Sequence, residues 1–63
     1  MMLINPTIEE AAIALAKNKD IIRFNRILTT EELAKLQHLW AAIRKSMQLC
    51  ATIKDGNTTI EEK

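Results

Sequence analysis

The feature that most constrains the fold is a run of apolar residues with helical spacing in the second half of the chain. Successive members are three or four residues apart, which is the spacing of a heptad seam along one face of a helix. The seam contains Leu33, Leu36, Trp40, Ile43, Met47 and Cys50. A second row beside it contains Leu39, Ala42, Ser46, Leu49 and Ile53. One helix with two apolar faces has more surface to bury than one neighbouring helix covers, so the pattern predicts a helical hairpin that associates further.

A capping signal defines the start of this helix. Thr29 and Glu32 have the spacing of a capping box, in which each side chain accepts a hydrogen bond from the backbone N–H of the other residue. Thr30 is an alternative cap one residue later. Leu28 before the cap and Leu33 after it can form a hydrophobic staple. The sequence therefore predicts that a helix begins at Thr29 or Thr30.

The end of the helix is assigned from Asp55 and Gly56. Glycine just beyond a helix takes the left-handed conformation that ends it, so the helix is predicted to run to about Lys54. The residues that follow are mostly polar, and we expect residues 57–63 to be a mobile tail. Residues 1–56 then form a single helical domain.

The first half of the chain also carries helix signals, but with an interruption. Thr7 and Glu10 repeat the capping-box spacing. The apolar face that follows contains Ile8, Ala11, Ala12 and Leu15. After the polar residues 17–20, a second stripe in a different phase contains Ile21, Phe24, Ile27 and Leu28. Two interpretations stay open: a second short helix capped by Asp20, or one kinked helix over residues 7–28, since neither glycine nor proline breaks it.

Together these elements predict an all-α fold, in which one or two short N-terminal helices form a hairpin with a long C-terminal helix. A chain of 63 residues buries only about 60% of its unfolded surface, so association is expected to add stability. His38 and Cys50 are the only histidine and cysteine, which leaves neither a disulfide nor a four-ligand zinc site. We therefore expect a homodimer without a metal or other cofactor.

The surface for self-association is expected where the long helix extends beyond the shorter ones. Tryptophan on the seam serves either as a core residue or as an interface hot spot. The residues predicted for self-association or partner binding are Trp40, Met47, Leu49, Cys50 and Ile53.

Enzymatic activity is not expected. The acidic pairs at residues 9–10 and 31–32 lie in the first turns of helices, where carboxylates stabilise the helix dipole. Cys50 and His38 would lie about 18 Å apart along one helix, which is too far for a nucleophile and its base. A single glycine excludes a glycine-rich phosphate loop. We expect no small-molecule substrate.

A cytoplasmic location is predicted. No stretch approaches the ~18 consecutive apolar residues of a transmembrane helix. Glu9 and Glu10 lie where a signal peptide requires positive charge and then apolar residues. A lone cysteine also fits a reducing compartment. We expect no membrane contact.

Basic residues indicate an alternative function. Four of them lie between residues 17 and 26 against one acid, a local charge of +3 in a chain of net charge +1. Such a patch is sufficient for contacts with nucleic-acid phosphates, although a solvent-exposed polar face is the simpler interpretation. The candidate nucleic-acid-binding residues are Lys17, Lys19, Arg23, Arg26, Arg44 and Lys45. A helix-turn-helix is disfavoured, because Glu31 and Glu32 begin the long helix and would face the phosphates.

Residues 3–10, 23–26 and 36–40 resemble small early-region proteins of lambdoid bacteriophages, encoded between the exonuclease and excisionase genes. The resemblance covers the whole chain and includes no chemical motif. It implies an early-expressed cytoplasmic protein of an infected bacterium, associated with the lysis–lysogeny decision and with interference in host replication or cell cycle. No catalytic residues come with it. Together with the apolar stripes, it predicts a non-enzymatic regulatory protein that binds a host or phage protein and favours phage development.

Overall fold

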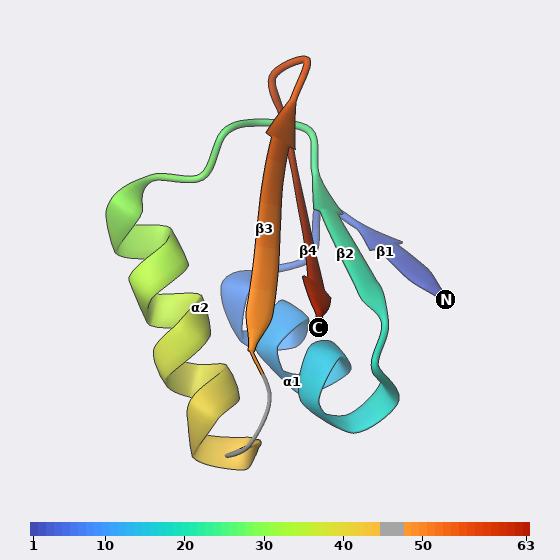
Figure 1. Cartoon of the computed structure of the whole chain (residues 1–63), viewed down its shortest axis with the longest axis vertical. Coiled ribbons are helices and arrows are strands. Elements are labelled where there is room, and N and C mark those ends of the chain that lie inside the picture. Colours follow the sequence, from blue (N-terminus) through green and yellow to red (C-terminus); the bar gives the residue numbers. More distant parts are fainter. Residues whose placement is uncertain (45–47) are drawn as a thin grey trace.

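The computed structural model describes residues 1–44 and 48–63 and has a mixed α/β fold (Figure 1). Its elements are β1 (Met2–Ile4), α1 (Ile8–Asn18), β2 (Ile21–Phe24), α2 (Thr30–Ile43), β3 (Leu49–Lys54) and β4 (Asn57–Glu62). The strands form one sheet in the order β1-β2-β4-β3. Strands β1 and β2 are parallel and are connected through α1, whereas β4 is antiparallel to both β2 and β3. The predicted all-α hairpin is therefore wrong.

Helix α1 begins where the sequence predicts. The Thr7 hydroxyl accepts a hydrogen bond from the Glu10 N–H at 3.1 Å, and the Glu10 carboxylate accepts one from the Thr7 N–H at 3.0 Å. The Thr7 backbone N–H first, and the Thr7 hydroxyl second, favour the charged form of this carboxylate and lower the pKa of Glu10. The helix ends at Asn18, and Lys19 follows in the left-handed conformation with φ 54°. The polar residues 17–20 therefore end the helix, and the continuous helix over residues 7–28 is wrong.

The second short helix is also wrong, because the apolar residues after α1 alternate with a period of two. Ile22 and Phe24 are buried, whereas Ile21 and Arg23 are half-buried on the opposite side of the strand. This is the pattern of a strand with one face in the core. Asp20, the cap expected for a second helix, is instead buried, and its carboxylate lies 3.5 Å from the amino group of Met1.

Helix α2 begins with the second predicted capping box. The Thr29 hydroxyl accepts from the Glu32 N–H at 3.1 Å, and the Glu32 carboxylate accepts from the Thr29 N–H at 3.0 Å. The guanidinium of Arg26 donates to the same carboxylate oxygen at 2.7 Å. The Arg26 hydrogen bond first, and the Thr29 N–H second, lower the pKa of Glu32 to about 2. The helix ends at Ile43, so the predicted continuation to Lys54 is wrong.

The chain beyond α2 forms a β-hairpin. Its turn consists of Asp55 and Gly56, with φ values of 53° and 75°. An Asp-Gly pair with two positive φ angles is typical of a two-residue hairpin turn, so Gly56 turns a hairpin and does not end a helix. The residues expected to be a mobile tail form β4, which pairs with strands on both sides. Alternation of inward and outward residues explains the difference, because half of the β4 residues face the core.

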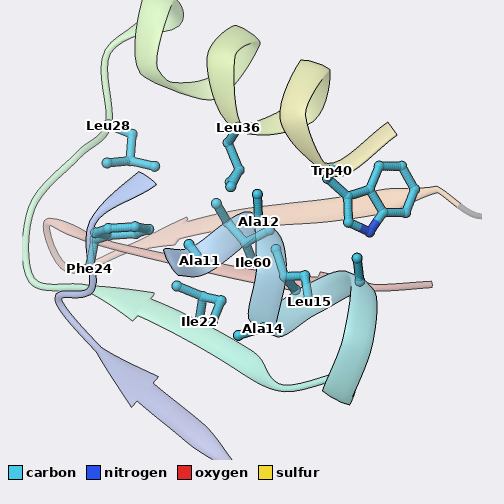
Figure 2. Close-up of a cluster of buried hydrophobic side chains, with 11 residues drawn as sticks. Ala11, Ala12, Ala14, Leu15, Ile22, Phe24, Leu28, Leu36, Trp40 and Ile60 are labelled. Atoms are coloured by element: carbon cyan, nitrogen blue, oxygen red, sulfur yellow. The ribbon is translucent and has the colours of Figure 1, made fainter. Parts of the chain in front are cut away.

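Both helices pack on one face of the sheet (Figure 2). Leu36 and Trp40 project from α2 towards the sheet, where Ile22 and Ile60 lie opposite each other on β2 and β4. The buried apolar residues of this core are Ala11, Ala12, Ala14, Leu15, Ala16, Ile22, Phe24, Leu28, Leu36, Trp40 and Ile60. Within the described residues, no helix packs on the other face, which we call the outer sheet face.

A buried hydroxyl holds the connection between β2 and α2. Thr58 on β4 is completely buried. Its hydroxyl donates to the Arg26 carbonyl at 2.8 Å and accepts from the Leu28 N–H at 3.2 Å. Because this connection has no secondary structure of its own, the hydroxyl supplies partners that its backbone groups otherwise lack.

The two helices run in the same direction. Near their starts, the Lys35 ammonium donates to the Glu9 carboxylate at 3.1 Å, and near their ends the Arg44 guanidinium donates to the Ala16 carbonyl at 3.4 Å. Neither of these helices has the length and apolar character that crossing a membrane requires.

Candidate functional site

The two helices leave an apolar hollow between them, on the side exposed to solvent. We call it the interhelical groove, and its volume is about 280 Å³. It is lined by Glu9, Ala12, Ile13, Leu39, Ala42 and Ile43. Ile13 and Ile43 are 46% and 47% exposed, although both are large apolar side chains. A partner that covered them would gain apolar burial that the folded chain leaves unused.

Charge is confined to one end of the interhelical groove. Glu9 is the charged residue that lines it, and its carboxylate pairs with the ammonium of Lys35. The pKa of Glu9 is lowered, first by a hydrogen bond from its own backbone N–H in the first turn of α1 and then by Lys35. The rest of the lining is apolar, which suits the side chains of another protein better than a charged ligand.

The outer sheet face carries both apolar and basic side chains. Met2 and Ile4 on β1 are 47% and 54% exposed, and the register places them beside Ile21 and Arg23 of β2. Towards the hairpin turn this face has a shallow hollow of about 220 Å³, lined by Arg23, Lys54, Asp55, Asn57 and Thr59. The exposed apolar side chains of this face therefore lie on β1 and at the start of β2, and the polar ones lie towards the hairpin turn.

The residues predicted for self-association lie on two elements. Trp40 on α2 is 3% exposed and belongs to the core. Leu49, Cys50 and Ile53 lie on β3, an edge strand, where Leu49 packs partly against the core and Ile53 is 53% exposed. Cys50 is a free thiol of intermediate exposure. Met47 lies outside the described residues.

A buried carboxylate that the sequence patterns do not predict joins α2 to β4. The side chain of Glu62 is 4% exposed, and one carboxylate oxygen lies 3.2 Å from Nε of Arg44. The other accepts a hydrogen bond from the indole N–H of Trp40 at 3.3 Å. The sequence places Glu62 in the predicted mobile tail, residues 57–63. The alternation of Thr58, Ile60 and Glu62 was the signal that could have placed it on an inward face.

The structure distributes the predicted basic residues over several elements. Lys17 and Lys19 lie at the end of α1, and Arg23 lies on the outer sheet face. Arg26 is engaged by Glu32 and also lies over the Phe24 ring, 5.6 Å from its centroid.

Arg44 is engaged by Glu62 at the far end of α2 from Arg26. Lys45 lies outside the described residues. Two of the predicted phosphate-binding residues are thus already paired with carboxylates.

Within the described residues, no group of three or more histidine, cysteine, aspartate or glutamate side chains is placed to hold a metal ion. Comparisons with protein-family models, curated proteins and solved structures found no match to this chain.

Proposed function

We propose that this chain is a non-enzymatic interaction protein that binds another protein through the interhelical groove. The observation that carries the proposal is the pair of exposed isoleucines, Ile13 and Ile43, on either side of an apolar hollow. As the resemblance to lambdoid early-region proteins implies, the partner is a host or phage protein, binding takes place in the bacterial cytoplasm, and its effect favours phage development.

The shape of the groove favours an amphipathic helix as the bound segment. The hollow is lined at helical spacing from both sides, by Ala12 and Ile13 of α1 and by Leu39, Ala42 and Ile43 of α2. A helix seated between two helices buries residues spaced three and four apart. The small side chains of Ala12 and Ala42 let it approach closely, and a cation on the bound helix could pair with Glu9 at one end.

Nucleic-acid binding is the second candidate, and Arg23 together with Lys54 on the outer sheet face favours it. Proteins that bind single strands combine such cations with exposed aromatic rings on which bases stack. Phe24 and Trp40 are the aromatic residues of this chain, and both are buried. The outer sheet face therefore offers phosphate contacts without a stacking platform, which favours protein binding over nucleic-acid binding.

The test combines site-specific crosslinking with matched lysine variants. A photoreactive amino acid at position 13 is activated in bacterial lysate, with and without nuclease, and crosslinked proteins are identified by mass spectrometry. Binding of the identified protein is then measured with purified components. The variants are Ile13→Lys and Ile43→Lys in the groove, and Ile27→Lys as the control, because Ile27 is 56% exposed but lies in the loop before α2.

The proposal predicts a nuclease-resistant crosslink to a defined protein. Each groove variant should weaken its binding by roughly tenfold or more, since burying an isoleucine contributes about 1.5–3 kcal/mol, and Ile27→Lys should bind normally. If all three variants bound the partner equally well, the interhelical groove would not be the binding site. Crosslinking that disappears on nuclease treatment, together with binding that weakens by orders of magnitude between about 50 and 200 mM salt, would establish the nucleic-acid alternative.

A further inference from the structure

Strand β3 presents an open edge of the sheet. It pairs with β4 over all six of its residues in continuous register, without a bulge. The order β1-β2-β4-β3 leaves its other side without a strand in the described part of the chain. Natural edge strands are usually protected by proline, by bulges or by inward-pointing charges. Residues 49–53 contain none of these, and the only charge on the strand is Lys54 at its end.

The hydrogen bonds to β4 show which backbone groups of β3 point outwards. The Lys63 N–H donates to the Gln48 carbonyl at 2.8 Å. Hydrogen-bonded and non-hydrogen-bonded pairs alternate along an antiparallel ladder, so Cys50 and Thr52 also direct their backbone groups to β4. The N–H and C=O groups of residues 49, 51 and 53 therefore point away from the sheet and are available to a further strand.

The same three residues carry side chains on the core side of the sheet. Ala51 lies opposite Ile60, whose side chain is buried in the core, so residues 49, 51 and 53 share the inner face. Ile53 is nevertheless 53% exposed, because the helices do not cover this end of the edge. The edge thus combines unpaired backbone groups with an uncovered apolar side chain.

We propose that β3 pairs antiparallel with β3 of a second copy of this chain, which joins two sheets into one of eight strands. A two-fold axis at Ala51 places Leu49 opposite Ile53 of the second copy and Ala51 opposite Ala51. All outward-pointing backbone groups then meet partners, and all inner-face side chains stay on the inner face. Cys50 lies opposite Thr52 of the second copy on the outer sheet face.

A second copy fits this edge better than an arbitrary strand, because the sequence of β3 complements itself. In the proposed register each exposed Ile53 meets Leu49, which already packs against the core, and Lys54 meets the uncharged Gln48. Moving the axis to Thr52 would leave Leu49 without a partner and place Lys54 opposite Cys50. Register follows the arrangement that keeps apolar residues together on the buried face.

A hollow beside the edge extends the apolar surface available to the second copy. It has a volume of about 180 Å³ and lies between α2 and the β3–β4 hairpin. Its lining is Leu33, Leu36, Gln37, Leu49, Ala51 and Ile60. Ile53 of the second copy, placed against Leu49, lies at the mouth of this hollow. The edge is separate from the interhelical groove, so the failure of one proposal would leave the other unaffected.

Disulfide formation tests the register directly. Residues in a non-hydrogen-bonded antiparallel pair have Cα atoms about 4.5 Å apart, within the range of about 4.4–6.8 Å that a disulfide requires. The variant Thr52→Cys keeps Cys50, so two disulfides should link the copies under mild oxidation. In the double variant Cys50→Ser/Thr52→Cys, each copy keeps one thiol, at position 52. These two thiols lie diagonally across the strand pair, too far apart for a disulfide, so the covalent dimer should be lost.

Solution mass tests the association itself. Light scattering after gel filtration should give twice the mass of one chain for the unmodified protein. Ile53→Lys places a charge on the inner face of the edge and should raise the dimer dissociation constant by roughly tenfold or more, because two Leu49–Ile53 pairs are lost in each dimer. Ile27→Lys and Ile13→Lys, at comparably exposed positions elsewhere, should leave the mass unchanged.

Three outcomes would overturn the proposal. The first is a monomer at every concentration up to the millimolar range. The second is a dimer that Ile53→Lys leaves intact, which would place the interface elsewhere. The third is equal crosslinking of Thr52→Cys with and without Cys50, which would move the two-fold axis to Thr52. Circular dichroism of each variant confirms that the fold is retained.

Discussion

The helix starts and the C-terminal hairpin are held by contacts of very different range. Thr7 with Glu10, and Thr29 with Glu32, form hydrogen bonds between residues three positions apart. The hairpin is held by contacts that join distant parts of the chain. Thr58 binds the loop before α2, and Glu62 binds Trp40 and Arg44. A helix start of this kind can form from its own residues, whereas β4 depends on β2, β3 and α2 being in place.

The largest effect is expected from a cavity in the hairpin core. Ile60 is 1% exposed and lies opposite Ile22 in the middle of the sheet. Replacing it by alanine should lower the free energy of unfolding by about 2–5 kcal/mol. Domains of this size are stable by only a few kcal/mol, so a part of the molecules should already be unfolded without denaturant. Urea denaturation followed by the fluorescence of Trp40 measures this loss of stability. If Ile60→Ala cost less stability than the removal of a helix cap, β4 would not occupy the centre of the sheet.

A smaller loss is expected when the polar contacts of the hairpin are removed without changing its shape. Thr58→Val keeps the volume of the side chain but leaves the Leu28 N–H and the Arg26 carbonyl without their buried partner. The expected cost is about 1–3 kcal/mol, measured by urea denaturation. Thr59→Val on the exposed side of the same strand is the matched control, and equal stability of the two variants would argue against the buried Thr58 contacts.

The helix caps should contribute less. Thr7→Ala and Thr29→Ala each remove one hydroxyl acceptor at a helix N-terminus, and each should lower the free energy of unfolding by about 1 kcal/mol. Thr30→Ala is the control, because Thr29 is the N-cap and Thr30 is the first residue of α2. If Thr30→Ala cost as much as Thr29→Ala, the alternative cap one residue later would be the correct one.

The smallest effect is a change in pH dependence. The Arg26 hydrogen bond first, and the Thr29 N–H second, lower the pKa of Glu32 from 4.5 to about 2. The Glu32 carboxylate binds its proton more weakly in the folded state than in the unfolded state. Its contribution to the free energy of unfolding is therefore present above about pH 4.5 and is lost as the pH falls towards 2. Thermal melts between these limits should show a shallower loss of stability for Glu32→Gln than for the unmodified chain. Parallel curves would indicate that the Glu32 contacts do not form.

Sequence patterns predicted the local features and missed the long-range ones. Both capping boxes and the break after α1 were predictable, because the residues that form them are adjacent in the chain. The apolar stripe predicts a helix up to Lys54, but the helix ends at Ile43. Leu49, Ala51 and Ile53 fit the period of two as well as the helical one, and the Asp-Gly turn was the signal that distinguishes them.

The sequence names only some of the residues that line the candidate surfaces. Leu49 and Ile53 are predicted to be association residues, and the structure places both on the edge strand β3, a position that the helical prediction did not include. Ile13, in the interhelical groove, was not singled out, because its exposure depends on how α1 packs against α2. Arg44 could not be assigned to Glu62 from the sequence, since only the hairpin brings the two together.

Hydrogen exchange of the backbone amides of residues 58–61 tests the central claim most directly. In this structure they belong to β4, which pairs with β2 on one side and β3 on the other. Amides in a central strand exchange only when the sheet opens. The account predicts that these four amides are among the most slowly exchanging in the protein, with Ile60 as slow as Leu36 in α2. Exchange at the rate of an unstructured chain would contradict it and would restore the mobile tail.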